Sequence, residues 1–409
     1  MTASASTGPT RDERRARLAV AAFFFANGAS YANVVPRLPE IKDALELSNT
    51  LYGLSIVAFP VGALISGLFA GSLIRRLGSA RLAAIGSIAL PLAILLVGIA
   101  PVPAIFALGM LLAGMIDSPT DVAQNAHGLR VQKRYGRSII NSFHAIWSLG
   151  AVVGGLMSAG AIALGLPIGL HLIINAALFA TVALIAYRLR LRGPDEPEID
   201  PETENALPAA SEVAQRARVS PALIGTFAAL ALIAIAATVV EDVGSSWATL
   251  YMSDGVGAAA AIAPLGYIAL IGFQFVGRLV GDRMVDRLGQ RTVARIGGAL
   301  VLIGMGSALA FPSVPGTLLG FAAAGFGVAT LVPATMQAAD SIPGLRPGTG
   351  LTLVTWLMRV GFLLSPLVIG IVSDATDLRI SLLLVPLVGL LVLALSGVLD
   401  RRKPALPSS

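Results

Sequence analysis

Several residue types are scarce in this chain of 409 residues, and each scarcity excludes a class of protein. Cysteine is absent, which excludes a disulfide framework and thiolate metal sites. The three histidines, His127, His144 and His171, are too far apart for a zinc motif, so we expect neither metal nor cofactor. Charged residues make up 13% of the chain, about half the roughly 25% of soluble domains. The chain also lacks a Walker motif, which argues against coupling to ATP.

Apolar residues are abundant instead, at 56% of the chain. A helix needs about 20 apolar residues to span the hydrocarbon core. Runs of this length recur along the whole chain, which predicts an all-α membrane protein and excludes a soluble enzyme. We expect twelve spans, of which the seventh is long and can be broken: 18–37, 51–74, 81–100, 103–127, 138–162, 165–189, 221–251, 261–284, 292–311, 314–338, 349–373 and 379–399.

The basic residues predict an orientation and not a nucleic-acid partner. The formal net charge is +6, but the Lys and Arg residues lie in gaps between apolar runs and not on one continuous face. Lys and Arg in short loops stay on the cytoplasmic side. With the N-terminus inside, 24 of the 29 fall in inner segments and only Arg37, Lys42 and Arg379 in outer ones. We therefore expect both termini to be cytoplasmic.

A polar segment divides the chain into two similar halves. Residues 190–219 contain four prolines and seven acids and are typical of a flexible linker. We expect a tail at 1–17, a six-helix bundle at 18–189, this linker, a second bundle at 220–400 and a tail at 401–409. The motifs that end at Gly78 and Gly289 lie 211 residues apart, and so do Ser148 and Arg359. Repeats of this kind place a substrate site between the halves, with alternating access from the two sides.

The segment from Gly71 to Gly78 resembles the turn after the second span of major facilitator superfamily transporters, roughly Gly-x-Leu-Ala-Asp-Arg-x-Gly-Arg. Here Arg75 stands where that turn has Asp, whereas the second half keeps Asp286 and Arg287. Within the superfamily, stretches such as 121–125 and 144–150 resemble a bacterial branch near the fucose-permease group. The resemblance implies two pseudo-symmetric six-helix bundles in the bacterial inner (plasma) membrane. It also implies a cytoplasmic gate made of Arg76, Gly78, Arg278, Asp282, Asp286 and Arg287.

Ionisable residues inside the spans are the candidates for proton coupling. A charge at the bilayer centre costs about 2.5–3.5 kcal/mol on insertion scales, so it is a functional hypothesis by default. Asp117, Asp121 and Asn125 share one face of the fourth span, and His144 lies at a similar depth in the fifth. An Asp beside a His can pass a proton. The alternative is that Asp121 and Asn125 only cap a helix end and that His144 only packs between helices.

Arg359 is about ten residues into the eleventh span, or about 15 Å deep. It needs a carboxylate partner or an anionic ligand, and Asp117 lies at a similar depth in the other half. We expect Arg359 either to bind a substrate carboxylate or phosphate, or to form a salt bridge that proton uptake breaks. A static structural pair is the alternative.

The adjacent acids Glu241 and Asp242 cannot share a helix face, so we expect one to face the cavity and the other a helix partner or the outer mouth. The alternative is that both sit at the outer water boundary. The predicted substrate-binding residues are Asn27, Tyr31, Gln124, Trp147, Glu241, Trp356 and Arg359. The predicted proton-coupling residues are Asp117, Asp121, His144 and Glu241.

These features predict a secondary transporter that works as a monomer, with a small solute, the proton and the bilayer as its partners. Our first hypothesis is proton symport of a small polar solute, either sugar-like or an organic anion. The runner-up is a drug or metabolite exporter with proton antiport, which would need a broader apolar cavity. A channel or a nontransporting sensor fits less well, since no segment outside the spans is long enough for a signalling domain.

Overall fold

The structure is a computed structural model, and it describes residues 10–136, 139–193, 195, 221–342 and 349–399. Most of the predicted linker at 190–219 and all of the tail at 401–409 lie outside these ranges, as do the first nine residues of the tail at 1–17.

The described chain is all-helical, and twelve helical segments are long and apolar enough to cross a membrane, which confirms the predicted count. The first half contains α1 (Arg11–Ala32), α2 (Leu38–Ala44), α3 (Asn49–Gly67), α4 (Ala70–Leu77), α5 (Ser79–Gly98), α6 (Pro103–Tyr135), α7 (Ile140–Ala163) and α8 (Ile168–Leu189). The second half contains α10 (Pro221–Ser246), α11 (Ala248–Leu250), α12 (Leu265–Leu288), α13 (Gln290–Ala310), α14 (Val314–Val328), α15 (Leu331–Asp340), α16 (Thr349–Ala375), α17 (Leu378–Ser381) and α18 (Leu384–Leu395).

Local signals explain where several helices begin and break. The first helix begins at Arg11 and not at residue 18, because Thr10 and Glu13 form a capping box. The seventh span is interrupted at Trp247, as its length suggested. The second and tenth spans, which we expected to be continuous, also break, at 68–69 and 329–330.

The two halves pack their helices in the same pattern. α1 contacts α7 as α10 contacts α16, α3 contacts α6 as α12 contacts α14, and α5 contacts α6 as α13 contacts α14. Gly78 and Gly289, 211 residues apart, both precede a helix with positive φ angles of 83° and 81°. A side chain is strained in that conformation, so the same glycine turn is needed twice. These equivalences confirm the predicted pseudo-symmetry.

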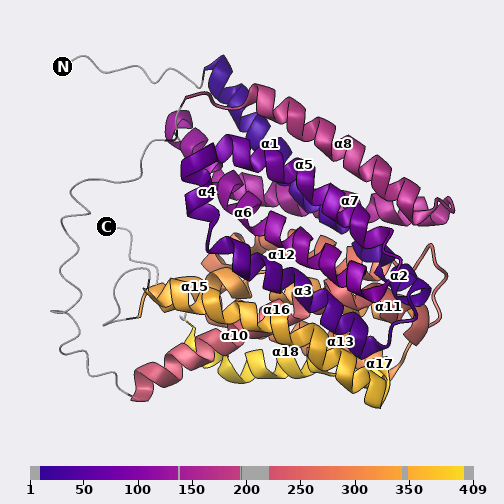
Figure 1. The fold of residues 1–409 in the computed structure, drawn as a ribbon. Coiled ribbons are helices and arrows are strands. Elements are labelled where there is room, and N and C mark those ends of the chain that lie inside the picture. The colour runs from indigo at the N-terminus through magenta and orange to yellow at the C-terminus, as the bar shows by residue number, and fades with distance from the viewer. Residues whose placement is uncertain (1–9, 137–138, 194, 196–220, 343–348, 400–409) are drawn as a thin grey trace, which may run out of the picture.

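The bundle has two ends that differ in how closely the halves approach (Figure 1). We call the end where α8 ends and α10 begins the linker end, and the opposite end, which carries α2, α11 and α17, the α2 end. α3 packs against α16, with Gly53 against the carbonyl of Pro366 and Gly370 against the carbonyl of Asn49. α7 packs against α12, where Gly155 meets Tyr267.

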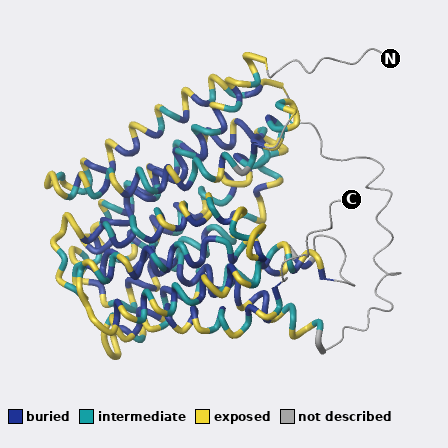
Figure 2. The backbone as a smooth tube through the Cα atoms, turned by 180° about the vertical axis from the view of Figure 1, so that it is seen from behind, coloured by how far each residue is buried: buried dark blue, intermediate teal, exposed yellow. Residues whose placement is uncertain are grey.

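Exposed positions lie on the outside of the bundle and buried positions concentrate in its interior (Figure 2). Many of the exposed side chains are large and apolar. The exposed set includes residues from most spans, for example Leu68, Leu92, Leu184 and Leu319. An apolar surface this extensive is a liability in water but matches hydrocarbon. The exposure pattern thus agrees with a multi-pass membrane protein.

Candidate functional site

Three hydrogen-bonded side chains join α1, α6 and α7. Nδ2 of Asn27 donates to Oδ1 of Asp117 at 2.8 Å, and Nε1 of Trp147 donates to Oδ1 of Asn27 at 2.8 Å. The two helices α1 and α7 approach closely here, because Gly28 lies against the backbone carbonyl of Trp147. Asp117 therefore has a positioned amide donor, and the amide is held in turn by the indole.

Asp121 lies one turn further along α6 and is exposed. Nδ2 of Asn125 donates to Oδ1 of Asp121 at 3.1 Å and to its backbone carbonyl at 2.9 Å. Arg359 of α16, in the other half, lies within electrostatic range of the Asp121 carboxylate. Within the described residues, no ion pair of 4.0 Å or less involves Arg359.

The expected cross-half pair of Asp117 with Arg359 is not formed among the described residues. Asp117 is held by Asn27 instead, and the electrostatic effect of Arg359 falls on Asp121. The reason is that residues four apart on α6 share a face but differ by one helical turn in depth. Sequence spacing could not decide which of the two turns meets α16.

The adjacent acids on α10 point to different neighbours. Asp242 is buried, and its Oδ1 accepts a hydrogen bond from the hydroxyl of Ser246 at 3.2 Å. Glu241 is half-buried, and its Oε2 accepts from Nε2 of Gln274 at 3.2 Å. Two adjacent helical residues are about 100° apart around the axis, so this divergence follows from the geometry.

Arg278 of α12 connects the two halves. Its Nη2 lies 4.0 Å from Oε2 of Glu241, and its Nη1 donates to the hydroxyl of Ser148 on α7 at 3.3 Å. The exposed ring of His144, one turn from Ser148, meets the edge of the Phe24 ring at 5.2 Å and lies within electrostatic range of Arg278. The side chains of Glu241, Arg278, Ser148 and His144 thus form a polar path from α10 to α7.

Arg278 and Asp282, two residues of the predicted cytoplasmic gate, do not pair with each other. Both residues are described, and the ion pair of Arg278 is with Glu241 and not with Asp282. The guanidinium reaches sideways to a neighbouring helix, where Gln274, one turn before Arg278, also contacts Glu241. Gln274 was not among the predicted residues, although a buried amide four residues before an intramembrane arginine is a usable signal.

Tyr31 interacts electrostatically with one acid from each half, Asp117 and Asp242. Its ring packs on Phe59 with centroids 4.9 Å apart.

Two predicted substrate-binding residues lie differently from the others. Gln124 is buried inside the first half, where its Nε2 donates to the carbonyl of Phe23 at 3.3 Å and to the hydroxyl of Ser87 at 3.4 Å. It packs among helices of its own half, so it does not belong to the surface between the halves. Trp356 is 59% exposed on α16, three residues before Arg359.

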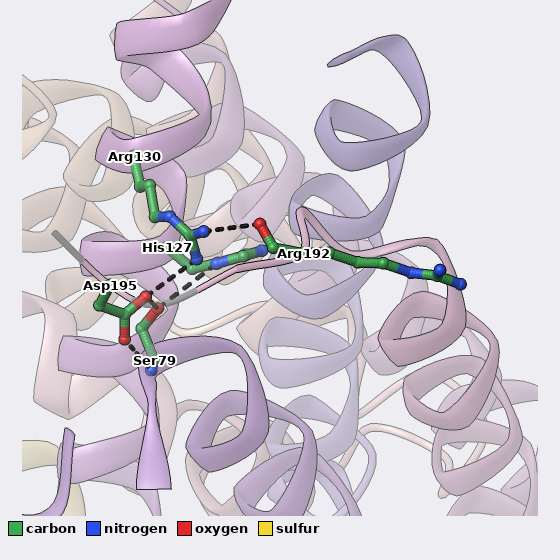
Figure 3. Close-up of polar contacts among 5 residues, drawn as sticks. All are labelled: Ser79, His127, Arg130, Arg192 and Asp195. Atoms are coloured by element: carbon green, nitrogen blue, oxygen red, sulfur yellow. Dashed lines mark hydrogen bonds and ion pairs between the residues drawn. The ribbon is translucent and has the colours of Figure 1, made fainter. Parts of the chain in front are cut away.

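Most predicted gate residues are exposed at the linker end, namely Arg76, Asp282, Asp286 and Arg287. Gly78 forms the turn before α5, and there Asp195 from the start of the linker supplies a carboxylate that sequence analysis missed (Figure 3). Asp195 accepts hydrogen bonds from the backbone N–H and the hydroxyl of Ser79, the latter at 2.8 Å, and forms an ion pair with Arg130 at 3.0 Å.

The buried His127 extends the contact between Asp195 and Ser79. Nδ1 of His127 lies 3.3 Å from the hydroxyl of Ser79, and Nη2 of Arg130 donates to the carbonyl of Arg192 at 2.8 Å (Figure 3). The half that carries Arg75 in place of the expected Asp therefore has an acid at its turn, contributed by the linker. The signal in the sequence is that Asp195 is the first of the seven linker acids.

The halves close on each other at the α2 end through residues that we did not predict. The hydroxyl of Tyr52 on α3 donates to the carbonyl of Ser246 at 2.7 Å, and its ring meets the Trp247 ring edge-on at 5.1 Å. Trp247 sits where α10 is interrupted, so the break places an aromatic side chain against the other half.

The polar side chains described in the earlier paragraphs lie in the region where the two halves face each other. We call this set the polar interface: Asn27, Tyr31, Asp117, Asp121, His144, Trp147, Glu241, Gln274, Arg278 and Arg359. It combines carboxylates, guanidinium groups, amides and an imidazole, which can bind a polar solute and exchange protons. Among the described residues, no three His, Asp or Glu side chains group as a metal site.

The profile of the Major Facilitator Superfamily matches residues 19–284 and 272–409. The chain belongs to the Major Facilitator Superfamily. This superfamily member is 28% identical over 386 residues to an uncharacterised transporter of Sinorhizobium fredii, covering 93% of this chain and 97% of that one. It is also 28% identical over 389 residues to the membrane protein MosC of Rhizobium meliloti, covering 95% and 91% of the two chains.

Solved structures share the fold of this superfamily member. The D323A mutant of the nucleoside transporter NupG has a TM-score of 0.73 at 14% identity, covering 93% of this chain and 99% of that one. The D-xylose-proton symporter has a TM-score of 0.70 at 16% identity, covering 96% and 98%. The chain is therefore a multi-pass membrane transporter of a small solute. The Sinorhizobium fredii relative is named as a transporter, and the two solved proteins are named as a transporter and a symporter.

Proposed function

We propose that this transporter moves a small polar solute, sugar-like or an organic anion, by proton-coupled alternating access. The observation that carries the proposal is Arg359 on α16, which forms no ion pair among the described residues. Asp121 of the other half interacts with it electrostatically. A guanidinium left without an ion pair is suited to a carboxylate or phosphate of the solute. A carboxylate beside it can take up and release a proton.

The remaining polar interface gives each group a role in this proposal. Trp147 holds Asn27 and Asn27 holds Asp117, which leaves the second N–H of the Asn27 amide to donate to a polar solute. Glu241, Arg278 and His144 form the path along which protonation at one half alters a contact with the other. Protonation of Glu241 would release Arg278, which would loosen the contact of α12 with α7. Such bistable charge contacts are a common basis of switching transitions.

The position of the closed end supports an inward-facing state. The aromatic and helix-packing contacts between α3 and α16 lie at the α2 end, which faces outward if the Lys- and Arg-rich linker end is cytoplasmic. Both termini are then cytoplasmic, in the inner membrane of a bacterium. The proposed gate residues Arg76, Asp282, Asp286 and Arg287 are exposed at the linker end, as expected when that end is open.

The branch near the fucose-permease group stays part of this proposal, supported by the stretches 121–125 and 144–150. Among solved folds, one protein is named for a nucleoside and one for D-xylose and a proton, both of them polar solutes. An exporter with proton antiport is the second candidate. The exposed Trp356 beside Arg359 favours it, since an exporter needs apolar surface for its cargo.

A binding screen tests the proposal. The purified full chain is heated with monosaccharides, nucleosides, small organic anions and apolar drugs at pH 5.5 and 7.5, and the melting temperature is recorded. We expect a polar solute to raise the melting temperature in a pH-dependent manner, and Asp121→Asn to remove the pH dependence. Arg359→Gln should abolish binding of the organic anions. Arg283→Gln, at an exposed position of α12, should change neither the pH dependence nor the binding of anions.

Two results decide against the proposal. Solute binding that is indifferent to pH and to Asp121→Asn would refute proton coupling at this carboxylate. Stabilisation by apolar drugs alone would replace the polar-solute hypothesis with the exporter.

A further inference from the structure

A basic pocket lies at the linker end of the first half, away from the polar interface. It has a volume of about 320 Å³ and is bounded by the start of α1 and the ends of α6 and α8. Its charged lining consists of five arginines and one acid: Arg15, Arg134, Arg188, Arg190, Arg192 and Asp12.

The positive charge of this pocket is not neutralised within the described residues. No ion pair there involves any of the five arginines. Arg190 donates to the carbonyl of Tyr187 at 2.7 Å and stacks over the Tyr187 ring at 3.7 Å, and both contacts leave its charge in place. One carboxylate, Asp12, stands against five guanidinium groups, so the pocket attracts anions strongly.

Helix dipoles account for only part of this cluster. The C-termini of α6 and α8 favour cations in their last turn, which suits Arg134 and Arg188. Arg15 comes from the second turn of α1, so the dipole of that helix does not account for its place beside four other arginines. Five guanidinium groups on one hollow repel one another, and a bound anion would relieve this repulsion. Guanidinium groups pair with phosphate oxygens in a bidentate geometry, so a phosphate fits the lining best.

An apolar stripe leads along α8 to this pocket. Ile174, Leu178, Ile185 and Leu189 are all exposed, and their spacing places them on one helical face together with Arg188. α8 lies at the outer edge of the bundle (Figure 1). In a membrane, its exposed apolar side chains therefore contact lipid. A lipid chain can therefore lie against α8 while its headgroup reaches the arginines. Basic pockets between spans at the membrane surface are known to bind anionic headgroups.

We propose that this pocket binds the headgroup phosphate of an anionic phospholipid, with the acyl chains against the exposed face of α8. A lipid phosphate and a free phosphate would form the same contacts with the arginines. The apolar stripe is what favours the lipid, because a free phosphate gains nothing from it. The site is independent of the solute path, so it can be tested without a transport assay.

The test is native mass spectrometry of the full chain in detergent. The protein is titrated with phosphatidylglycerol, with cardiolipin, with neutral phosphatidylcholine and with inorganic phosphate. The variant R15Q/R134Q/R188Q removes three charges from the pocket. The matched control is Lys133→Gln, which removes an exposed charge from the same end of α6 without lining the pocket.

We expect the triple variant to bind both anionic lipids at least roughly tenfold more weakly, since each basic residue near a membrane contributes to anionic lipid binding. Phosphatidylcholine binding should be unchanged, and Lys133→Gln should bind like the native chain. If the triple variant does not fold, Arg188→Gln alone, at an exposed position, should still weaken binding several-fold.

Two results would overturn the proposal. Equal lipid binding by the native chain and the charge-removed variants would show that the pocket is not the site. Inorganic phosphate that binds as tightly as phosphatidylglycerol and displaces it would make the ligand a free anion and not a lipid.

Discussion

Asp374 at the end of α16 accepts the backbone N–H of Asn49 at 2.9 Å and thereby caps the first turn of α3 in the other half. The same carboxylate accepts the N–H of Thr50 at 2.7 Å, and the amide of Asn49 donates to the hydroxyl of Ser373 at 3.0 Å. One helix thus satisfies the unpaired donors of another helix across the pseudo-symmetry axis. These bonds exist only while the α2 end is closed, so they stabilise that state.

Replacing Asp374 with Ala should shift the transporter toward opening at the α2 end. Loss of a helix cap costs about 0.5–2 kcal/mol, which corresponds to roughly a twofold to thirtyfold change in the ratio of the states. The chain has no cysteine, so cysteines introduced at Leu51 and Phe311 would be the only sites that a thiol-reactive spin label modifies. Both residues are exposed, and they lie in opposite halves. Pulsed electron paramagnetic resonance should then report a larger long-distance population.

The control is Asp377→Ala. Asp377 caps α17 within its own half, accepting the N–H of Ile380 at 2.8 Å, so its loss should leave the inter-half distance unchanged. Identical distance distributions for the native chain and Asp374→Ala would show that this cap does not stabilise the closed end.

Removing the amide of Asn27 should destabilise the first half. Asn27→Ala leaves the Asp117 carboxylate and the Trp147 indole without the partners that now lie at 2.8 Å from each. Burying such groups without partners costs about 1–3 kcal/mol, more for a charged group. The melting temperature in detergent should therefore fall clearly for Asn27→Ala and less for Trp147→Phe, which removes one bond. A stability of Asn27→Ala equal to that of Ser72→Ala, whose hydroxyl bonds only locally, would contradict this reading.

The contact between Glu241 and Arg278 should contribute little to stability. At 4.0 Å and with exposed fractions of 21% and 39%, the pair resembles a partly exposed salt bridge. Such pairs contribute about 0.2–1 kcal/mol. A double-mutant cycle with Glu241→Gln and Arg278→Gln should therefore give a small coupling energy in unfolding, while each single variant impairs transport. A coupling of several kcal/mol would mean that the pair holds the fold together and does not switch.

Replacing glycine with alanine should lower the stability at Gly62 and raise it at Gly160. A Cβ at Gly62 would collide with the carbonyl of Leu111, where α3 crosses α6, so Gly62→Ala should destabilise by about 1–3 kcal/mol. At Gly160 on α7 nothing lies within 4 Å, and Gly160→Ala should stabilise the helix by about 0.5–1 kcal/mol. Melting temperatures of the two variants give the comparison. If Gly160→Ala lowered the melting temperature as much as Gly62→Ala, the close helix crossing at Gly62 would not be the cause of the destabilisation.

Hydropathy and charge were enough to predict the twelve spans and their division into halves, because the bilayer requires long apolar runs and the repeat keeps its spacing of 211 residues. The divergence of Glu241 from Asp242 could be predicted because adjacent helical residues face different directions. The breaks at 68–69 and 329–330 could not, since the apolar runs continue through them.

Contacts between distant segments were the least predictable part of the site. Arg359 was expected to pair with Asp117, but it forms no ion pair among the described residues, and its electrostatic effect falls on Asp121, one turn further along α6. Gln124 seemed suited to a cavity because it is polar, but its helix turns it toward Phe23 and Ser87. Asp195 comes from the linker, where composition predicts no fixed position.

Solute-driven proton movement across a sealed membrane is the most direct test of the proposed mechanism. The full chain is reconstituted in liposomes that contain a pH-sensitive dye, and monosaccharides, nucleosides and small organic anions are added outside. For at least one of these solutes, the account predicts saturable proton flux that is abolished by Asp121→Asn and by Arg359→Glu and unaffected by Arg283→Gln. Saturable solute uptake with no proton flux, or flux that survives both variants, would contradict it.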